Sequence, residues 1–150
     1  MAKQQIVIVN TGCANISSVK FAFDRLGVEV TVSDEPQVIS GADKVLLPGV
    51  GSATAAMDSI HKKQLASTVQ SLSQPVLGVC LGMQLMVTAS QESTTDSTEC
   101  LNLIPGHVER MQVGDLRLPH MGWNTVTPVH QNDLFKSLDE GSYFYFVHSF

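Results

Sequence analysis

One cysteine in this sequence has the surroundings of a nucleophile. Cys80 stands between Gly78 and Gly82, after a short apolar run that predicts a buried strand and before an apolar-periodic run that predicts a helix. Gly-x-Cys-x-Gly is the sequence form of a nucleophile elbow, with sulfur in place of a serine oxygen. The glycines leave room for the sharp turn from strand to helix. We therefore expect Cys80 to project at the carboxyl edge of a sheet, where the positive end of the helix favours the thiolate.

Two backbone segments are candidates to bind the oxyanion that such a nucleophile creates. The N–H of Leu81 points to where the oxyanion would form. Pro48-Gly49-Val50-Gly51 follows another predicted strand and offers further backbone N–H groups. A loop of this kind is also a common tight turn, and it lacks the Gly-Lys-Ser/Thr of a phosphate-binding loop. We expect it to supply a second oxyanion donor and one wall of the substrate site.

Composition narrows the class of protein. The 150 residues are 43% hydrophobic and 15% charged, and they suffice for one domain with its own core. A net charge of −5 with only 9 Lys and Arg argues against nucleic acid as the main ligand. No apolar run approaches the length of a membrane span, and the first residues do not resemble a signal peptide.

The remaining cysteines predict no chemistry of their own. Free cysteine is usually a small buried apolar residue, and no role is assigned to Cys13, in a turn, or to Cys100, in a polar loop. Three cysteines without paired spacing favour the reducing cytoplasm over a disulfide framework. No spacing of Cys and His predicts a zinc site, and no metal or organic cofactor is expected.

Strands and helices are predicted to alternate along the first two thirds of the chain. Asn15 is a plausible N-cap for a helix that ends before Gly27. Alternation of this kind predicts an α/β fold with a doubly wound, mostly parallel sheet and helices on both faces. The expected strands are 6–9, 28–32, 45–47 and the run before Cys80, and the expected helices are 16–26, about 52–72 and the one after Cys80.

The last third of the chain has a different character. Residues 91–99 are polar and predict a mobile loop. From Gly106 onward the sequence is β-rich, and residues 143–147 form a strong strand pattern. A compact domain rarely finishes on such a strand. We therefore expect residues 1–150 to form a single domain that is incomplete at its C-terminus; the alternative is an edge strand at a natural terminus.

Taken together, these motifs resemble the class I glutamine amidotransferases, and within them the glutaminase subunits of imidazole glycerol phosphate synthase, which serve histidine biosynthesis. The resemblance covers nearly the whole chain. The elbow carries the family likeness, and two further segments carry the narrower one. The matching segments are Asn10-Thr11-Gly12-Cys13-Ala14-Asn15, Leu47-Pro48-Gly49-Val50-Gly51, 75–85, Leu118-Pro119-His120-Met121-Gly122-Trp123-Asn124 and 143–149.

The resemblance implies roles for individual residues. Cys80 would attack the side-chain amide of L-glutamine, and the ammonia would pass to a cyclase subunit. Gln84, His148 and Ser149 would join the oxyanion segments in binding glutamine. The residues implied at the interface with the cyclase are Asn15, Pro119, His120, Met121, Trp123 and Asn124.

One departure from the family pattern concerns the catalytic base. The family completes its triad with a histidine and a glutamate near the C-terminus, usually as His-Pro-Glu, and none of the five histidines here is followed by Pro-Glu. These 150 residues are therefore expected to be inactive by themselves. Three alternatives stay open: another class I glutaminase subunit, a different elbow-cysteine hydrolase or redox-responsive protein, and a non-catalytic fragment or interaction module.

Overall fold

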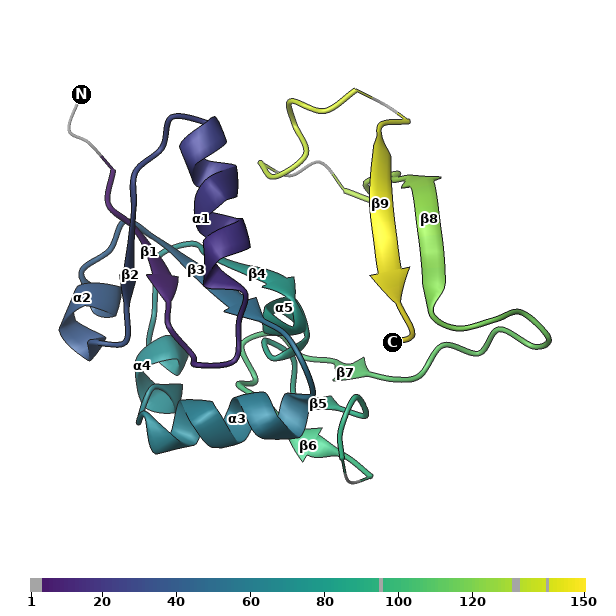
Figure 1. Cartoon of the computed structure of the whole chain (residues 1–150), viewed down its shortest axis with the longest axis horizontal. Coiled ribbons are helices and arrows are strands. Elements are labelled where there is room, and N and C mark those ends of the chain that lie inside the picture. The colour runs from purple at the N-terminus through teal and green to yellow at the C-terminus, as the bar shows by residue number, and fades with distance from the viewer. Residues whose placement is uncertain (1–3, 95, 131–132, 140) are drawn as a thin grey trace. The chain divides into compact units, whose positions relative to one another are not determined.

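The computed structural model describes residues 4–94, 96–130, 133–139 and 141–150 (Figure 1). The chain divides into two compact units, Met1–Glu109 and Arg110–Phe150. A single domain over residues 1–150 stays a prediction. Every helix among the described residues is too short or too polar to cross a lipid bilayer.

A four-stranded parallel sheet forms the centre of the first unit. Its strands are ordered β2-β1-β3-β4 (Figure 1). The apolar run of β1 is inaccessible from Val7 to Val9, as expected for a strand covered on both faces. The strands are β1 (Ile6–Val9), β2 (Val30–Ser33), β3 (Lys44–Gly49) and β4 (Val76–Cys80).

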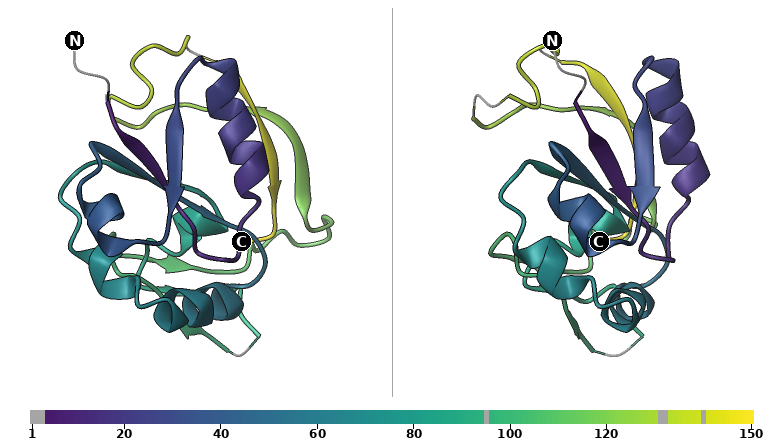
Figure 2. Two further views of the ribbon diagram at one scale, coloured as in Figure 1. Left: turned by 60° about the vertical axis from the view of Figure 1, so that its left-hand side comes forward. Right: turned by 90° about the vertical axis from the view of Figure 1, so that its left-hand side faces the viewer.

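Helices lie on both faces of this sheet. The helices are α1 (Ile16–Arg25), α2 (Pro36–Ser40), α3 (Ala53–Lys62), α4 (Ala66–Gln70) and α5 (Leu81–Gln84). The chain moves outward from β1 to β2 and then back across to β3, so right-handed crossovers place α1 opposite α2 and α3 (Figure 2). The direction reverses between β1 and β3, and ligands of such sheets bind at the carboxyl ends of the strands there. The predicted doubly wound architecture is confirmed.

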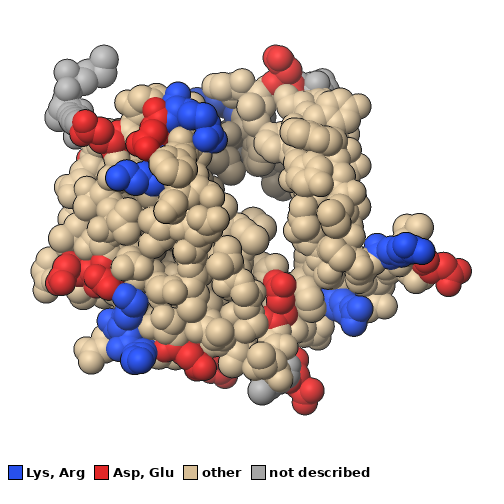
Figure 3. Space-filling view, in the orientation of Figure 1, with Lys and Arg blue, Asp and Glu red and all other residues tan. Residues whose placement is uncertain are grey.

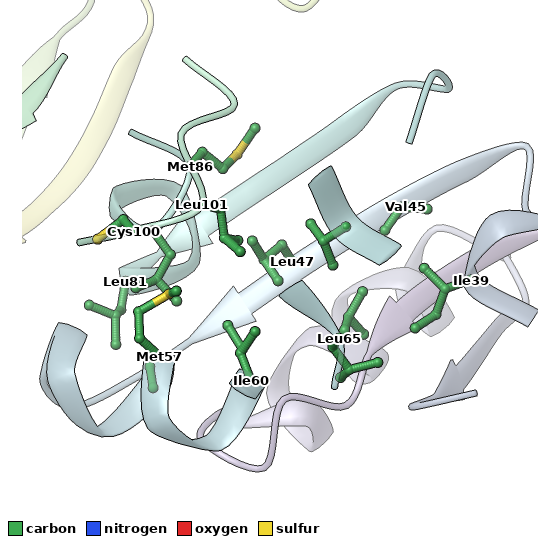
Figure 4. Close-up of a cluster of buried hydrophobic side chains, with 14 of the residues drawn as sticks. Ile39, Val45, Leu47, Met57, Ile60, Leu65, Leu81, Met86, Cys100 and Leu101 are labelled. Atoms are coloured by element: carbon green, nitrogen blue, oxygen red, sulfur yellow. The ribbon is translucent and has the colours of Figure 1, made fainter. Parts of the chain in front are cut away.

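The core of the first unit lies between the sheet and α2–α4 (Figure 4). Leu47 on β3 is fully buried, and so are Ile60 on α3 and Leu65 just before α4. Leu81 and Leu85 extend the same cluster to the segment that follows Cys80. The apolar packing therefore fixes the elbow segment to the rest of the unit.

The helix expected over residues 52–72 is two helices. The chain leaves the helical path at Gln64, which has a φ of 57°, between α3 and α4. Its N–H bonds to the His61 carbonyl, and the N–H of Leu65 bonds to the Ile60 carbonyl. The break turns Leu65 into the core, and burial of that side chain outweighs the cost of a left-handed residue.

Apart from residue 95, which lies outside the described residues, the polar segment 91–99 is more structured than the predicted mobile loop. It contains β6 (Thr98–Glu99), which joins β5 (Ala89–Ser90) and β7 (His107–Val108) in a small sheet. The hydroxyls of Thr54, Ser93 and Thr98 form a closed triangle with O–O distances of 2.7–2.8 Å. Thr54 lies in the first turn of α3, so these bonds tie the segment to that helix.

The second unit is built on a two-stranded antiparallel sheet. β8 (His120–Thr125) pairs with β9 (Tyr143–His148), and His120 lies opposite His148. β9 confirms the strand predicted at 143–147. Accessibility alternates along β9, so Phe144, Phe146 and His148 lie on the less exposed face.

Replacing Leu47 with alanine tests the role of this core. We expect Leu47→Ala to lower the free energy of unfolding by about 2–5 kcal/mol, because a buried side chain is lost and a cavity remains. Leu26→Ala is the control, since Leu26 is 75% exposed, and we expect a change within about 0.5 kcal/mol. Urea unfolding measures both. Equal losses in the two variants would contradict the assigned core.

Candidate active site

Cys80 occupies the sharp turn that the elbow motif predicts. It is the last residue of β4 and the N-cap of α5, with φ 54° and ψ −125°. A positive φ is uncommon for a residue with a side chain and is typical of functional positions. The Cys80 side chain is exposed. The strained turn therefore presents the sulfur to solvent at the end of its strand.

The elbow glycines permit contacts that a side chain would block. A Cβ on Gly82 would collide with the carbonyl oxygen of Leu47, and a Cβ on Gly78 would collide with the backbone of Met83. A Cβ on Gly49 would come within 2.7 Å of the Gly82 nitrogen. Backbone therefore packs directly against backbone where β3, β4 and α5 meet, and this contact holds Cys80 beside the glycine-rich loop.

The expected oxyanion loop lies next to Cys80. Gly49 is the register partner of Cys80, and Val50 and Gly51 continue from it. The Val50 N–H donates to the carbonyl of Cys13 at 2.9 Å, so in this conformation it is not directed at an oxyanion on Cys80. Donation to an oxyanion by Leu81 and by the Gly49–Gly51 loop stays a prediction. The Val50 N–H can donate to an oxyanion only after its bond to the Cys13 carbonyl breaks.

Gln84 has an unsatisfied polar atom. It ends α5, one turn after Cys80. Its side-chain oxygen Oε1 is buried and has no hydrogen-bond partner among the described residues. An unpaired buried acceptor costs about 1–3 kcal/mol. This geometry suits an acceptor that binds a donor group of a ligand.

The three cysteines differ in accessibility. Cys80 is exposed, Cys13 is intermediate and Cys100 is buried. Burial raises the pKa of the Cys100 thiol, which disfavours its thiolate at neutral pH. α5 is only four residues long, so its helix dipole favours the Cys80 thiolate only weakly. Exposure and backbone geometry are therefore the main distinctions of Cys80.

The predicted substrate residues His148 and Ser149 belong to the second unit. The His148 ring bonds to His120 and to the main-chain oxygen of Phe150. The Ser149 carbonyl accepts from the Met111 N–H at 2.9 Å. Their contact with glutamine stays a prediction.

The residues predicted at the interface with the cyclase lie in both units, and those on β8 lie on both faces of the strand. Asn15 lies in the first unit, where its side chain caps α1 by accepting from the Ser18 N–H. Pro119 is exposed immediately before β8. Met121 and Trp123 are 60% and 66% exposed on one face of β8. The alternation of the strand places His120 and Asn124 on the opposite face, where their side chains bond to each other.

Charged groups provide little evidence for a metal or nucleic-acid site. Among the described residues, no group of three or more His, Cys, Asp and Glu side chains is arranged to hold a metal ion. On the face drawn in Figure 3, Lys and Arg are interspersed with Asp and Glu.

His107 and Glu109 have the His-x-Glu spacing of the family's acid–base pair, which was not predicted from the sequence. Both residues are exposed, in and just after β7.

Comparison with known proteins decides the family. The family model described as "Glutamine amidotransferase class-I" matches residues 7–150. The chain belongs to this family. The resemblance to class I glutamine amidotransferases that the elbow carries is thereby confirmed, and the elbow lies inside the matched region.

Several curated relatives of this amidotransferase share about half of its residues. "Imidazole glycerol phosphate synthase subunit HisH 1" of Vibrio vulnificus (strain YJ016) is 54% identical over 153 residues, which cover 100% of the chain and 75% of the relative. "Imidazole glycerol phosphate synthase subunit HisH" of Colwellia psychrerythraea is 54% identical, and the match covers 100% of the chain and 72% of the relative. The protein of the same name from Idiomarina loihiensis is 52% identical, and the match covers 97% of the chain and 71% of the relative.

Alkylation of the folded amidotransferase chain tests the elbow. We expect iodoacetamide at neutral pH to label Cys80 at least about tenfold faster than Cys100, because Cys80 is exposed and the Cys100 thiol is buried with a raised pKa. Peptide mapping after brief treatment measures each site. Cys80→Ser is the control and should remove the fast phase. Faster labelling of Cys13 or Cys100 would contradict the assignment.

Proposed function

We propose that this chain is the glutaminase subunit of an imidazole glycerol phosphate synthase. It hydrolyses L-glutamine to glutamate and ammonia and supplies the ammonia to a cyclase partner in histidine biosynthesis. The observation that carries the proposal is Cys80, exposed on a positive-φ turn inside a glutamine amidotransferase sequence. The names and identities of the relatives support the narrower assignment. We expect the enzyme to act in the cytoplasm as a heterodimer.

The first chemical step is attack by the Cys80 thiolate on the side-chain amide carbon of glutamine. A carbon–sulfur bond forms, and the carbonyl electrons move to oxygen as a tetrahedral oxyanion. The N–H of Leu81 and an N–H of the Gly49–Gly51 loop stabilise that oxygen. Because the Val50 N–H bonds to Cys13, full stabilisation requires this loop to change its hydrogen bonding.

The second step breaks the carbon–nitrogen bond. The departing nitrogen takes a proton and leaves as ammonia, and a glutamyl thioester remains on Cys80. Water then adds to the thioester carbon, and the carbon–sulfur bond breaks to release glutamate. Each step needs an acid–base group, because an amide anion is a poor leaving group and neutral water is a weak nucleophile.

Gln84 supports the binding of glutamine beside Cys80. Its buried Oε1 is an acceptor that lacks a protein partner among the described residues, and a substrate ammonium or amide N–H would satisfy it. His148 and Ser149 complete the proposed substrate contacts from the end of β9.

An exposed apolar face on β8 and β9 is the proposed docking surface for the cyclase. The Trp123 and Tyr145 rings form an edge-to-face pair with centroids 5.4 Å apart. Large aromatic side chains of this kind are typical interface anchors, and a contiguous exposed apolar patch is typical of an interaction site. The face consists of Met121, Trp123, Tyr143, Tyr145 and Val147, each more than half exposed.

Glutamate release tests the proposed reaction. The 150 residues, assayed with the cyclase subunit, should release glutamate at a rate about 10²–10⁴-fold lower than the same sequence continued through a His-Pro-Glu segment, because acid–base help is absent. Cys80→Ser should abolish release by the longer chain. Enzymatic detection of glutamate measures the rates.

His107→Asn in the longer chain is the matched control, and its rate should equal that of the unaltered longer chain. A similar rate for the 150 residues and the longer chain would contradict the prediction that the 150 residues lack the catalytic base. A large loss in His107→Asn would then identify an alternative base. Activity that survives Cys80→Ser would remove the nucleophile from the proposal.

Binding to the cyclase subunit tests the docking surface. We expect Trp123→Ala to weaken binding by about 2 kcal/mol, or roughly 30-fold in Kd, because an aromatic anchor is lost. Val129→Ala is the control: Val129 is 88% exposed in the same unit but lies outside β8 and β9, and its replacement should leave Kd unchanged. Isothermal titration measures both. Unchanged binding by Trp123→Ala would remove this residue from the interface.

A further inference from the structure

A chain of hydrogen bonds runs along the less exposed face of β8 and β9. Asn124 Nδ2 lies 2.9 Å from His120 Nε2, His120 Nδ1 lies 3.3 Å from His148 Nε2, and His148 Nδ1 lies 2.8 Å from the main-chain oxygen of Phe150. Gly122 lies between His120 and Asn124 on the same face and has no side chain to separate them. The chain therefore connects an asparagine of β8 to the residue that follows Ser149.

The acceptor at the end of this hydrogen-bond chain determines which atom donates in each of its bonds. A main-chain oxygen can only accept, so His148 Nδ1 carries a proton and donates to Phe150. In a neutral ring the other nitrogen, Nε2, then accepts, and the donor facing it is His120 Nδ1. His120 Nε2 must in turn accept, which agrees with the amide nitrogen of Asn124 as its donor. When both rings are neutral, both histidines are therefore Nδ1–H tautomers.

The same bonds must rearrange when the pair takes up a proton. A proton on His148 makes Nε2 a donor, so His120 must accept at Nδ1 and donate at Nε2, and Asn124 must rotate to present its oxygen. A second proton would set two donors against each other across the 3.3 Å link. Arg117, which lines the adjoining hollow of about 460 Å³, adds positive charge there, and the Phe150 oxygen that faces His148 Nδ1 belongs to the terminal carboxylate of the 150-residue chain and adds negative charge. The Phe146 ring packs against both imidazoles and contributes no charge.

We propose that Asn124 and His120 are positioning residues for the end of β9: they set the tautomer and orientation of His148 and thereby hold Ser149. This assigns the two β8 side chains a role beyond the partner contact predicted from the sequence. Only the link to glutamine, through His148 and Ser149, rests on the proposed function. The hydrogen-bond chain itself stands on the geometry of the second unit.

Nitrogen-15 NMR of the histidine-labelled 150-residue chain tests this inference. At neutral pH the two bonded rings should show the Nδ1–H signature, whereas a solvated neutral imidazole favours Nε2–H. Asn124→Asp replaces the donor with a charged acceptor. The introduced carboxylate accepts from His120 Nε2, so the His120 ring should lose its Nδ1–H signature and carry a proton on Nε2.

Met121→Asp is the matched control, because it adds the same charge on β8 beside His120, and the Met121 side chain is 60% exposed on the other face of the strand. It should leave both tautomers unchanged. Nε2–H tautomers in the unaltered chain overturn the inference even where Asn124→Asp fails to fold. An equal change of tautomer in both variants also overturns it. These signals do not depend on Cys80 or glutamine, so loss of glutaminase activity tests the proposed function separately.

Discussion

Direct packing of backbone against backbone at the elbow is the constraint on which the candidate site depends. Gly82 meets the Leu47 carbonyl, and Gly49 meets the Gly82 nitrogen. This contact requires residues without side chains, and it forces Cys80 into a conformation with φ 54°. The buried Leu47 and Leu81 surround the contact, so burial of apolar side chains stabilises the strained turn.

The chemistry of the chain is distributed between its two units. The first unit holds the nucleophile, the glycine-rich loop and Gln84. The second unit holds a sheet whose two faces have different characters. One face exposes Met121 and Trp123, while the other carries the hydrogen-bond chain through His120 and His148. Successive side chains of β8 point to opposite faces. Those on one face belong to the proposed docking surface for the cyclase, and those on the other face belong to the hydrogen-bond chain that holds His148.

Several features depended on contacts between residues distant in sequence. The break at Gln64 follows from burial of Leu65 in the core, which local helical patterning does not reveal. The polar residues of segment 91–99 predict a loop, but hydroxyls from α3 give Ser93 and Thr98 partners. Local composition describes what a segment favours alone, and tertiary hydrogen bonds and apolar burial alter the result.

The sequence by itself determined the elbow, the alternation of strands and helices, the N-cap at Asn15 and the family, because each is recorded in residues a few positions apart. Only the tertiary structure decided that the Val50 N–H bonds to Cys13, and that His120 bonds to His148. Those residues lie 37 and 28 positions apart, so sheet pairing and loop packing had to bring them together. Hydrogen bonding is short-ranged and directional, and no periodic pattern in the sequence encodes such a pair.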